Sequence, residues 1–181
     1  PHDHSFVKGH AKRTARAALG NVPEDGAPFT EARVESGITG LEVFKSTGSA
    51  FSGFNQDEYT TLPETEDRIL ATTIDAGWRY LEGGGRDDGG GRDYGAIRES
   101  VENAILQIFA THESPSLQAT LYLMGETVLA AVQDIAEISF NMPNQHHILF
   151  DLEPFGLEND KEIFYGTDSP FGIITGTVAR D

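Results

Sequence analysis

An aromatic pair and an arginine occur close together between residues 51 and 69. Phe51 and Phe54 come first, and Arg68 follows a short acidic stretch. A planar guanidinium offers two parallel donors to a flat anion, and an aromatic ring stacks on a flat ligand. The alternative is a surface Arg68 in an ion pair with one of its acidic neighbours, which are Glu64, Glu66 and Asp67. Composition by itself favours the ion pair.

Gln118 is a second polar residue in a place that suits an anion. It follows Ser114-Pro115, which predicts a helix start with serine as the N-cap and proline at the first helical position. The exposed N–H groups of a first helical turn make a positive end that favours bound anions. Without further context, a glutamine at this point is most often a solvated side chain.

Asn144 and His146 form a third polar group, directly after Pro143. An asparagine after proline is typical of a turn, and His146-His147 is typical of a strand start with one ring buried. Adjacent side chains in a strand point to opposite faces, so we do not expect these two histidines to share a metal ion. Three histidines near the start lack the carboxylate or thiolate partners of a metal site: His2, His4 and His10.

The composition limits the class of protein. A chain of 181 residues with 38% hydrophobic residues is long enough for one core, so we expect a single domain over residues 1–181. Cysteine is absent, which excludes disulfides and thiolate chemistry. A net charge of -16 opposes binding to nucleic acid, and it is compatible either with ordinary solubility or with adaptation to high salt. We expect no membrane span and no signal segment.

Hydrophobic patterns predict an α+β fold. Residues 30–45 are predicted to pair back on residues 4–19 as a long hairpin, and residues 69–80 form a third strand. The core side of this third strand should carry Leu70, Thr72, Ile74, Ala76 and Trp78. A glycine-rich run, 83–91, lacks the lysine and hydroxyl of a phosphate-binding loop and predicts a flexible surface loop.

Two amphipathic helices and a second group of strands complete the prediction. Apolar residues at three- and four-residue steps indicate helices over 97–109 and 117–132. The strands expected afterwards are 138–142, 148–152, 163–166 and 173–178. Strands, two helices and then more strands indicate a sheet with helices on one face.

Four segments together resemble the urate oxidases, or uricases. They are residues 2–6 (HDHSF), 51–72 (FSGF, DEYTTL and DRILAT), 117–120 (LQAT) and 142–147 (MPNQHH). They occur in the family's order and run from the first residues to the last strands, so the chain resembles the C-terminal half of a uricase. One departure is Gln145, where many family members have lysine.

The resemblance implies a tunnelling fold (T-fold), with both helices on one side of an antiparallel sheet and four subunits forming a tunnel. It also implies oxidation of urate by O2 to 5-hydroxyisourate and H2O2, without a metal or organic cofactor. In this family Phe51 would stack on the purine, while Arg68 and Gln118 would clamp its edge. Apolar walls would come from Leu62 and Leu117. Catalytic roles would fall to Asn144, which positions oxygen or water, and to His146, which joins a proton relay.

The resemblance further implies a missing part. The family's catalytic lysine and threonine belong to the N-terminal half, so we expect a companion segment or chain. The chain starts at Pro1 without an initiator methionine, which we interpret as a piece of something longer, and its last residues lack the peroxisomal tripeptide. A prokaryotic cytoplasm is therefore expected. The alternatives are a non-catalytic T-fold protein that binds a purine or pterin or only completes a ring of subunits, and a generic acidic interaction domain.

Overall fold

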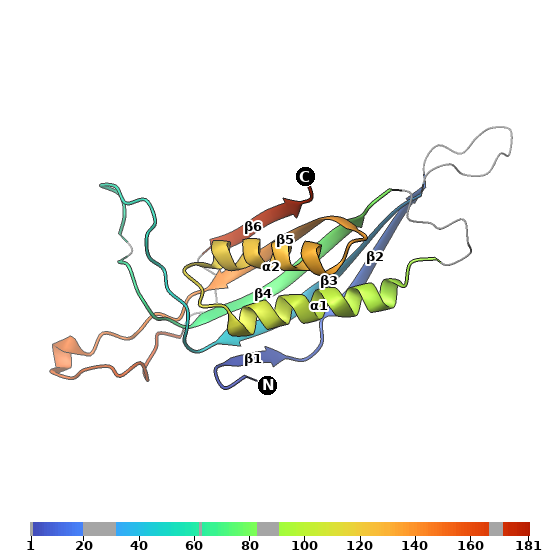
Figure 1. Ribbon diagram of the computed structural model, residues 1–181. Helices are drawn as coiled ribbons and strands as arrows, with labels where there is room; N and C mark the ends of the chain where they lie inside the picture. The colour runs from blue at the N-terminus through green and yellow to red at the C-terminus, as the bar shows by residue number, and fades with distance from the viewer. Residues whose placement is uncertain (1, 20–31, 62, 83–90, 167–171) are drawn as a thin grey trace, which may run out of the picture.

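The computed structural model describes residues 2–19, 32–61, 63–82, 91–166 and 172–181. Within them the chain forms one antiparallel sheet of six strands, in the order β1-β3-β4-β5-β6, with β2 also paired to β3 (Figure 1). The strands are β1 (Ser5–Lys8), β2 (Lys12–Leu19), β3 (Ala32–Lys45), β4 (Leu70–Tyr80), β5 (Ile135–Gln145) and β6 (Gly172–Ala179).

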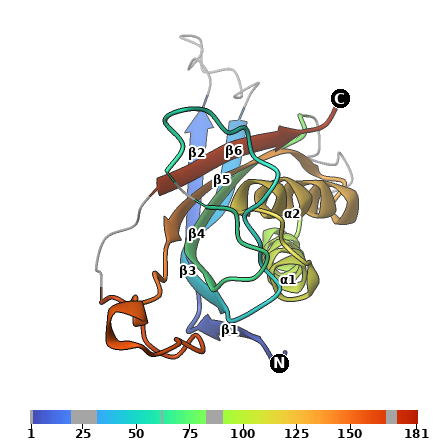
Figure 2. The same ribbon diagram turned by 90° about the vertical axis from the view of Figure 1, so that its left-hand side faces the viewer.

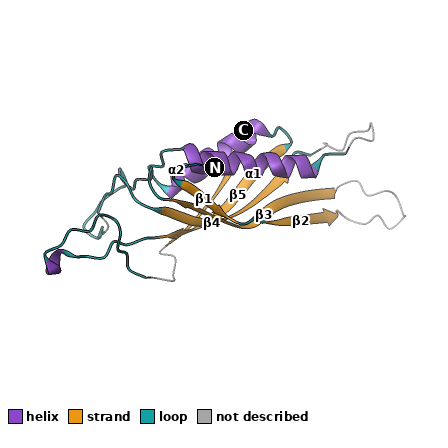
Figure 3. Ribbon diagram, turned by 90° about the horizontal axis from the view of Figure 1, so that it is seen from below, coloured by secondary structure: helices purple, strands orange, loops and turns teal. Residues whose placement is uncertain are grey.

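Two helices, α1 (Tyr94–Thr111) and α2 (Leu117–Ala131), lie together on one face of the sheet (Figure 3). Their buried residues form one continuous core with the sheet residues beneath them. Every residue predicted for the core side of β4 is buried: Leu70, Thr72, Ile74, Ala76 and Trp78. The predicted α+β class and the placement of both helices on one face are thus confirmed. Neither helix combines the length and the apolar character that crossing a bilayer requires.

The start of α2 differs from the prediction. Its N-cap is Ser116, whose side chain accepts a hydrogen bond from the N–H of Ala119 at 3.1 Å. Ser114 was expected to be the cap, but its backbone is engaged elsewhere: its N–H donates to Gly48 O, and its carbonyl accepts from Ala50 N. This pairing holds Ser114 outside the helix, so the helix begins at Leu117 and not at Pro115, which was predicted to be the first helical position.

The first part of the chain is divided where one strand was expected. β1 and β2 each pair antiparallel with β3, so the predicted pairing of the N-terminal segment with residues 30–45 is confirmed. Gly9, which separates the two strands, has a φ of 69°, a left-handed conformation that suits glycine. The glycine-rich run 83–91 lies outside the described residues except for Gly91, so its flexibility remains a prediction.

Residues 148–165 leave the sheet. They were predicted to contain two sheet strands, which is wrong: the segment folds back on itself through one bridge between Leu149 and Phe164. It includes a short 3-10 helix, Glu153–Phe155, and projects beyond the end of β5 (Figure 2). Neither α1 nor α2 covers this segment, and several of its apolar side chains are exposed. The hydrophobic pattern therefore indicated extended chain here, but it could not show that these residues lie outside the main sheet.

Candidate active site

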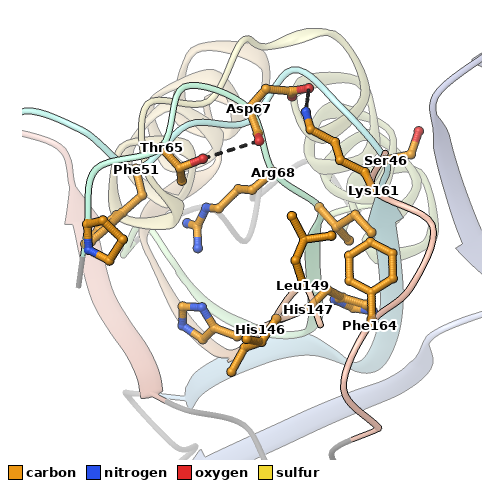
Figure 4. Close-up of a pocket in the computed structure, with 13 residues that line it drawn as sticks. Ser46, Phe51, Thr65, Asp67, Arg68, His146, His147, Leu149, Lys161 and Phe164 are labelled. Carbon is orange, nitrogen blue, oxygen red and sulfur yellow. Dashed lines mark hydrogen bonds and ion pairs between the residues drawn. The ribbon is translucent and has the colours of Figure 1, made fainter. Parts of the chain in front are cut away.

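A pocket of about 400 Å³ lies at the end of the sheet where β4 begins and β5 ends (Figure 4). This volume falls within the usual range for small-molecule sites. Three stretches of chain contribute its walls: residues 46–69, residues 146–149 after β5, and residues 161–164. The lining includes the side chains of Phe51, Asp67, Arg68, His146, Lys161 and Phe164.

Backbone hydrogen bonds hold the Phe51 and Arg68 segments together. Phe51 and Thr65 exchange two such bonds, at 2.8 and 3.0 Å, and the N–H of Arg68 donates to Ser49 O at 2.7 Å. Ala50 N in turn donates to Ser114 O, which precedes α2. These bonds place the arginine, the aromatic ring and the N-terminal end of α2 on one connected support. The segment can therefore hold side-chain positions although it lacks regular secondary structure.

Arg68 points into the pocket beside Phe51 (Figure 4). Its guanidinium carbon lies 5.2 Å from the centre of the Phe51 ring, within cation-π range. Phe51 is itself stacked on Phe54, with ring centres 4.4 Å apart. This contact fixes the ring, and the ring supports the guanidinium.

The guanidinium of Arg68 lacks hydrogen-bond partners at two buried atoms. Nε and Nη2 are shielded from solvent, yet neither bonds to any group in the described parts of the chain. Two of the three neighbouring acids bond to other groups: Glu64 accepts from Gly53 N, and Asp67 accepts from Lys161. Burial lowers the pKa of Arg68, but an arginine stays cationic at neutral pH. Buried, unpaired donors are costly, which makes this group a candidate site for an anion.

His146 faces the same pocket from the other side (Figure 4). Burial lowers the pKa of this half-buried imidazole, and the positive charge of Arg68 and the electrostatic interaction with His147 lower it further. His146 is therefore neutral at pH 7. A neutral imidazole beside a bound anion is able to accept a proton.

Three predicted site residues are not part of the lining of this pocket. Asn144 is buried within β5, opposite Thr72 of β4. Leu117 is the first residue of α2 and is fully buried, whereas Gln118 after it is exposed. Leu62, the fourth, lies outside the described residues. The structure thus brings Phe51, Arg68 and His146 into one pocket, and it leaves the other roles as predictions.

Sequence reasoning missed the pocket wall formed by Lys161, Phe164 and Asp67. Lys161 is 94 residues from Asp67 in the chain, and no sequence motif predicts their contact. Asp67 had been considered only as a possible partner of Arg68. Among the described residues, no three side chains of the metal-binding types gather closely enough to hold an ion.

The fold is that of an α+β protein of the T-fold class, and its pocket contains Phe51, Arg68 and His146. The Uricase family model matches residues 34–175, and the chain belongs to the uricase family. The uricase of Arthrobacter globiformis is 42% identical over 180 residues, covering 99% of this chain and 55% of that protein. The uricase of Emericella nidulans is 39% identical over 186 residues, with shares of 99% and 60%.

Solved structures agree with this assignment. The crystal structure of the Arthrobacter globiformis uricase superposes with a TM-score of 0.78 at 42% identity, over 93% of this chain and 54% of that one. Urate oxidase from Bacillus sp. TB-90 gives a TM-score of 0.69 at 27% identity, with shares of 93% and 54%. The chain therefore spans about half the length of the relatives that it matches.

Proposed function

We propose that this chain carries the urate-binding part of a urate oxidase. The observation that carries the proposal is the Arg68 guanidinium, which is buried, unpaired in the described residues and set beside the Phe51 ring. Urate at neutral pH is a flat monoanion with adjacent oxygen and nitrogen acceptors along one edge. A guanidinium fork matches such an edge with two charge-assisted hydrogen bonds, and an aromatic ring stacks on the purine plane.

The proposed reaction takes two electrons and two protons from urate and gives them to O2, which becomes H2O2. Water supplies the hydroxyl group of 5-hydroxyisourate. Because urate is the reductant, the protein's part is to orient the reactants and to move protons. In this scheme His146 accepts a proton, and Asn144 positions oxygen or water.

The remaining contacts follow the same proposal. Gln118 in the first turn of α2 is assigned to the pyrimidine edge of urate together with Arg68. Its support is the backbone link between residue 50, next to Phe51, and Ser114 just before α2. Leu117, buried at the start of α2, and Leu62 are assigned to the apolar wall.

A second component completes the site in this proposal. The chain spans about half of its relatives' length, and the resemblance assigns the catalytic lysine and threonine to the other half. We propose that this half is supplied by another stretch of the same polypeptide or by a companion chain. The single domain of residues 1–181 would then join a tetramer-like tunnel. We also propose a prokaryotic cytoplasm as the location, which cell fractionation would test.

The decisive experiment compares this chain alone with the same chain plus the N-terminal half. Loss of urate absorbance and uptake of oxygen are followed together. We expect negligible turnover from the chain alone, because general acid-base catalysis contributes about 10²- to 10⁴-fold, and we expect turnover in the reconstituted protein. Full activity from the single chain would show that other residues carry catalysis. Urate binding without turnover in the complete assembly would favour the alternative, a non-catalytic purine- or pterin-binding T-fold protein.

A further inference from the structure

Residues 148–165, called here the arm, fold back on themselves after β5, and Lys161 and Phe164 of the arm line the pocket. The arm is closed by backbone bonds of 2.9 Å from Phe150 N to Ile163 O and from Tyr165 N to Ile148 O. The Asn159 side chain ties the two sides further, donating to Phe150 O at 2.8 Å and to Ile163 O at 2.7 Å. The arm is thus internally ordered, and what matters for the pocket is how it is attached.

Lys161 attaches the arm to the arginine segment. Its Nζ donates to Asp67 Oδ2 at 3.1 Å, directly beside the pocket (Figure 4). The same carboxylate accepts from Thr47 Oγ1 at 2.9 Å and from Gly48 N at 3.0 Å. One side chain, Asp67, therefore joins the arm, the turn after β3 and the segment that carries Arg68.

The backbone conformation at Lys161 favours glycine, although the residue carries a long side chain. Lys161 has a φ of 62°, and it is the non-glycine residue with positive φ in the described parts of the chain. A left-handed conformation costs a residue with a Cβ on the order of 1 kcal/mol, and glycine would avoid the cost. A lysine at this position is explained if its ammonium group makes a contact that glycine, which has no side chain, cannot make.

We propose that Lys161 is a positioning residue. Through Asp67 it holds the arm against the segment of Arg68, and it thereby sets the position of the guanidinium that would bind the anion. Asp67 and Arg68 are consecutive, and Arg68 N is bonded to Ser49, one residue beyond the Gly48 amide that Asp67 accepts. A shift of the carboxylate is therefore transmitted to the guanidinium. The part of this inference that concerns urate rests on the proposed function.

The ion pair is open to salt. The two side chains are 58% and 39% exposed, so dissolved ions screen their attraction. Burial opposes ionisation of Asp67, but the hydrogen bonds from Lys161, Thr47 and Gly48 outweigh it and hold the pKa of the carboxyl below its ordinary value. Asp67 is therefore charged at neutral pH, and it is screening by salt that weakens the link.

The first test measures the affinity for urate under anaerobic conditions in the complete assembly. Lys161→Gln and Asp67→Asn should each weaken binding about two- to fivefold in dilute buffer, the range for exposed ion pairs. The double variant should be no weaker than one single variant, since both remove the same link. Lys161→Arg should restore most of the affinity. In about 1 M salt, where the Debye length is about 3 Å, the differences should vanish.

Asp67→Asn separates positioning from direct attraction. The asparagine keeps an oxygen for Thr47 and Gly48, while it removes a negative charge near the bound anion. If Lys161 acted only through its own charge on urate, Asp67→Asn would tighten binding, and that result would overturn the proposal. Lys8→Gln is the matched control for Lys161→Gln: it breaks the exposed Lys8–Glu42 pair, 2.9 Å long, with the same loss of one positive charge.

A second readout needs no urate. Amide hydrogen exchange in residues 148–165 should quicken in Lys161→Gln and in Asp67→Asn but not in Lys8→Gln. Unchanged exchange together with unchanged urate affinity would overturn the proposal. If the wild-type assembly does not bind urate at all, the proposed function fails. The exchange measurement then still decides whether Lys161 couples the arm to Asp67.

Discussion

Replacing Arg68 by methionine should destroy anion binding while leaving the fold intact. Methionine keeps an apolar stem of similar length against Phe51, and it removes the guanidinium whose Nε and Nη2 are buried without partners in the described residues. Arg68→Met therefore removes the energetic cost of unpaired buried donors from the free protein, and it removes two hydrogen-bond donors from the complex with urate. The two effects have opposite signs, which makes the prediction specific.

The magnitudes follow from these contacts. Hydrogen bonds to charged groups contribute about 1.5–3 kcal/mol each, so losing two costs about 3–6 kcal/mol of binding free energy. At about 1.4 kcal/mol per tenfold, the Kd for urate should rise about 10²- to 10⁴-fold. The free energy of unfolding should stay level or rise by up to about 1 kcal/mol, since an unpaired buried donor is lost and the cation-π contact partly offsets that gain.

The assay pairs two measurements on one preparation. Anaerobic calorimetric titration with urate gives Kd, and denaturant unfolding gives stability. A drop of about 3 kcal/mol in the free energy of unfolding, with Kd unchanged, would refute the reasoning, because it is the result expected for a structural buried ion pair. Lys8→Met, at an exposed position outside the pocket lining, is the control for loss of a positive charge.

Phe51→Ala should weaken urate binding by about 1–3 kcal/mol, the usual contribution of an aromatic ring stacked on a base; an unchanged Kd would remove the stacking role. Burial and nearby charges lower the pKa of His146, so its imidazole becomes protonated only at a pH below the ordinary pKa of histidine. The acid limb of the pH profile of kcat/KM should therefore lie below about pH 6.5, and a limb above it would contradict the assignment. With a net charge of -16, the melting temperature should rise from dilute to molar salt if the surface is salt-adapted, and a flat or falling trend would reject this. Gly125→Ala should lower the free energy of unfolding by about 1–3 kcal/mol, because the added Cβ would lie 2.4 Å from Val178 Cγ2. An unchanged midpoint of denaturant unfolding would show that α2 and β6 shift to accommodate the methyl group.

The fold class was readable because local patterns and global burial agree. Alternation along β4 and the three- to four-residue steps in α1 put apolar side chains on one side of each element, and the structure buries those sides together. The start of α2 was misjudged since Ser114 and Ser116 are equally good caps by type. Only the pairing of Ser114 with residues 48–50 decides between them.

For the site, the residues themselves indicated the chemistry but not their neighbours. Phe51 and Arg68 were selected from type and from resemblance, and their 5.2 Å contact agrees with that choice. The sequence could not say whether Arg68 is paired with the acids around it. That depends on where Glu64 and Asp67 point, and they point to Gly53 and Lys161.

By itself, the sequence determined what is encoded locally: the acidic surface, the alternation of the strands, the amphipathic helices and the identity of the groups able to bind a flat anion. Only the tertiary structure decided which of these groups meet. A hydrogen bond such as that between Lys161 and Asp67 joins residues 94 positions apart, and its existence depends on the path of the whole chain between them. Burial has the same origin: Nε and Nη2 of Arg68 are shielded from solvent at a pocket whose lining comes from three separate segments, and no single segment carries that information.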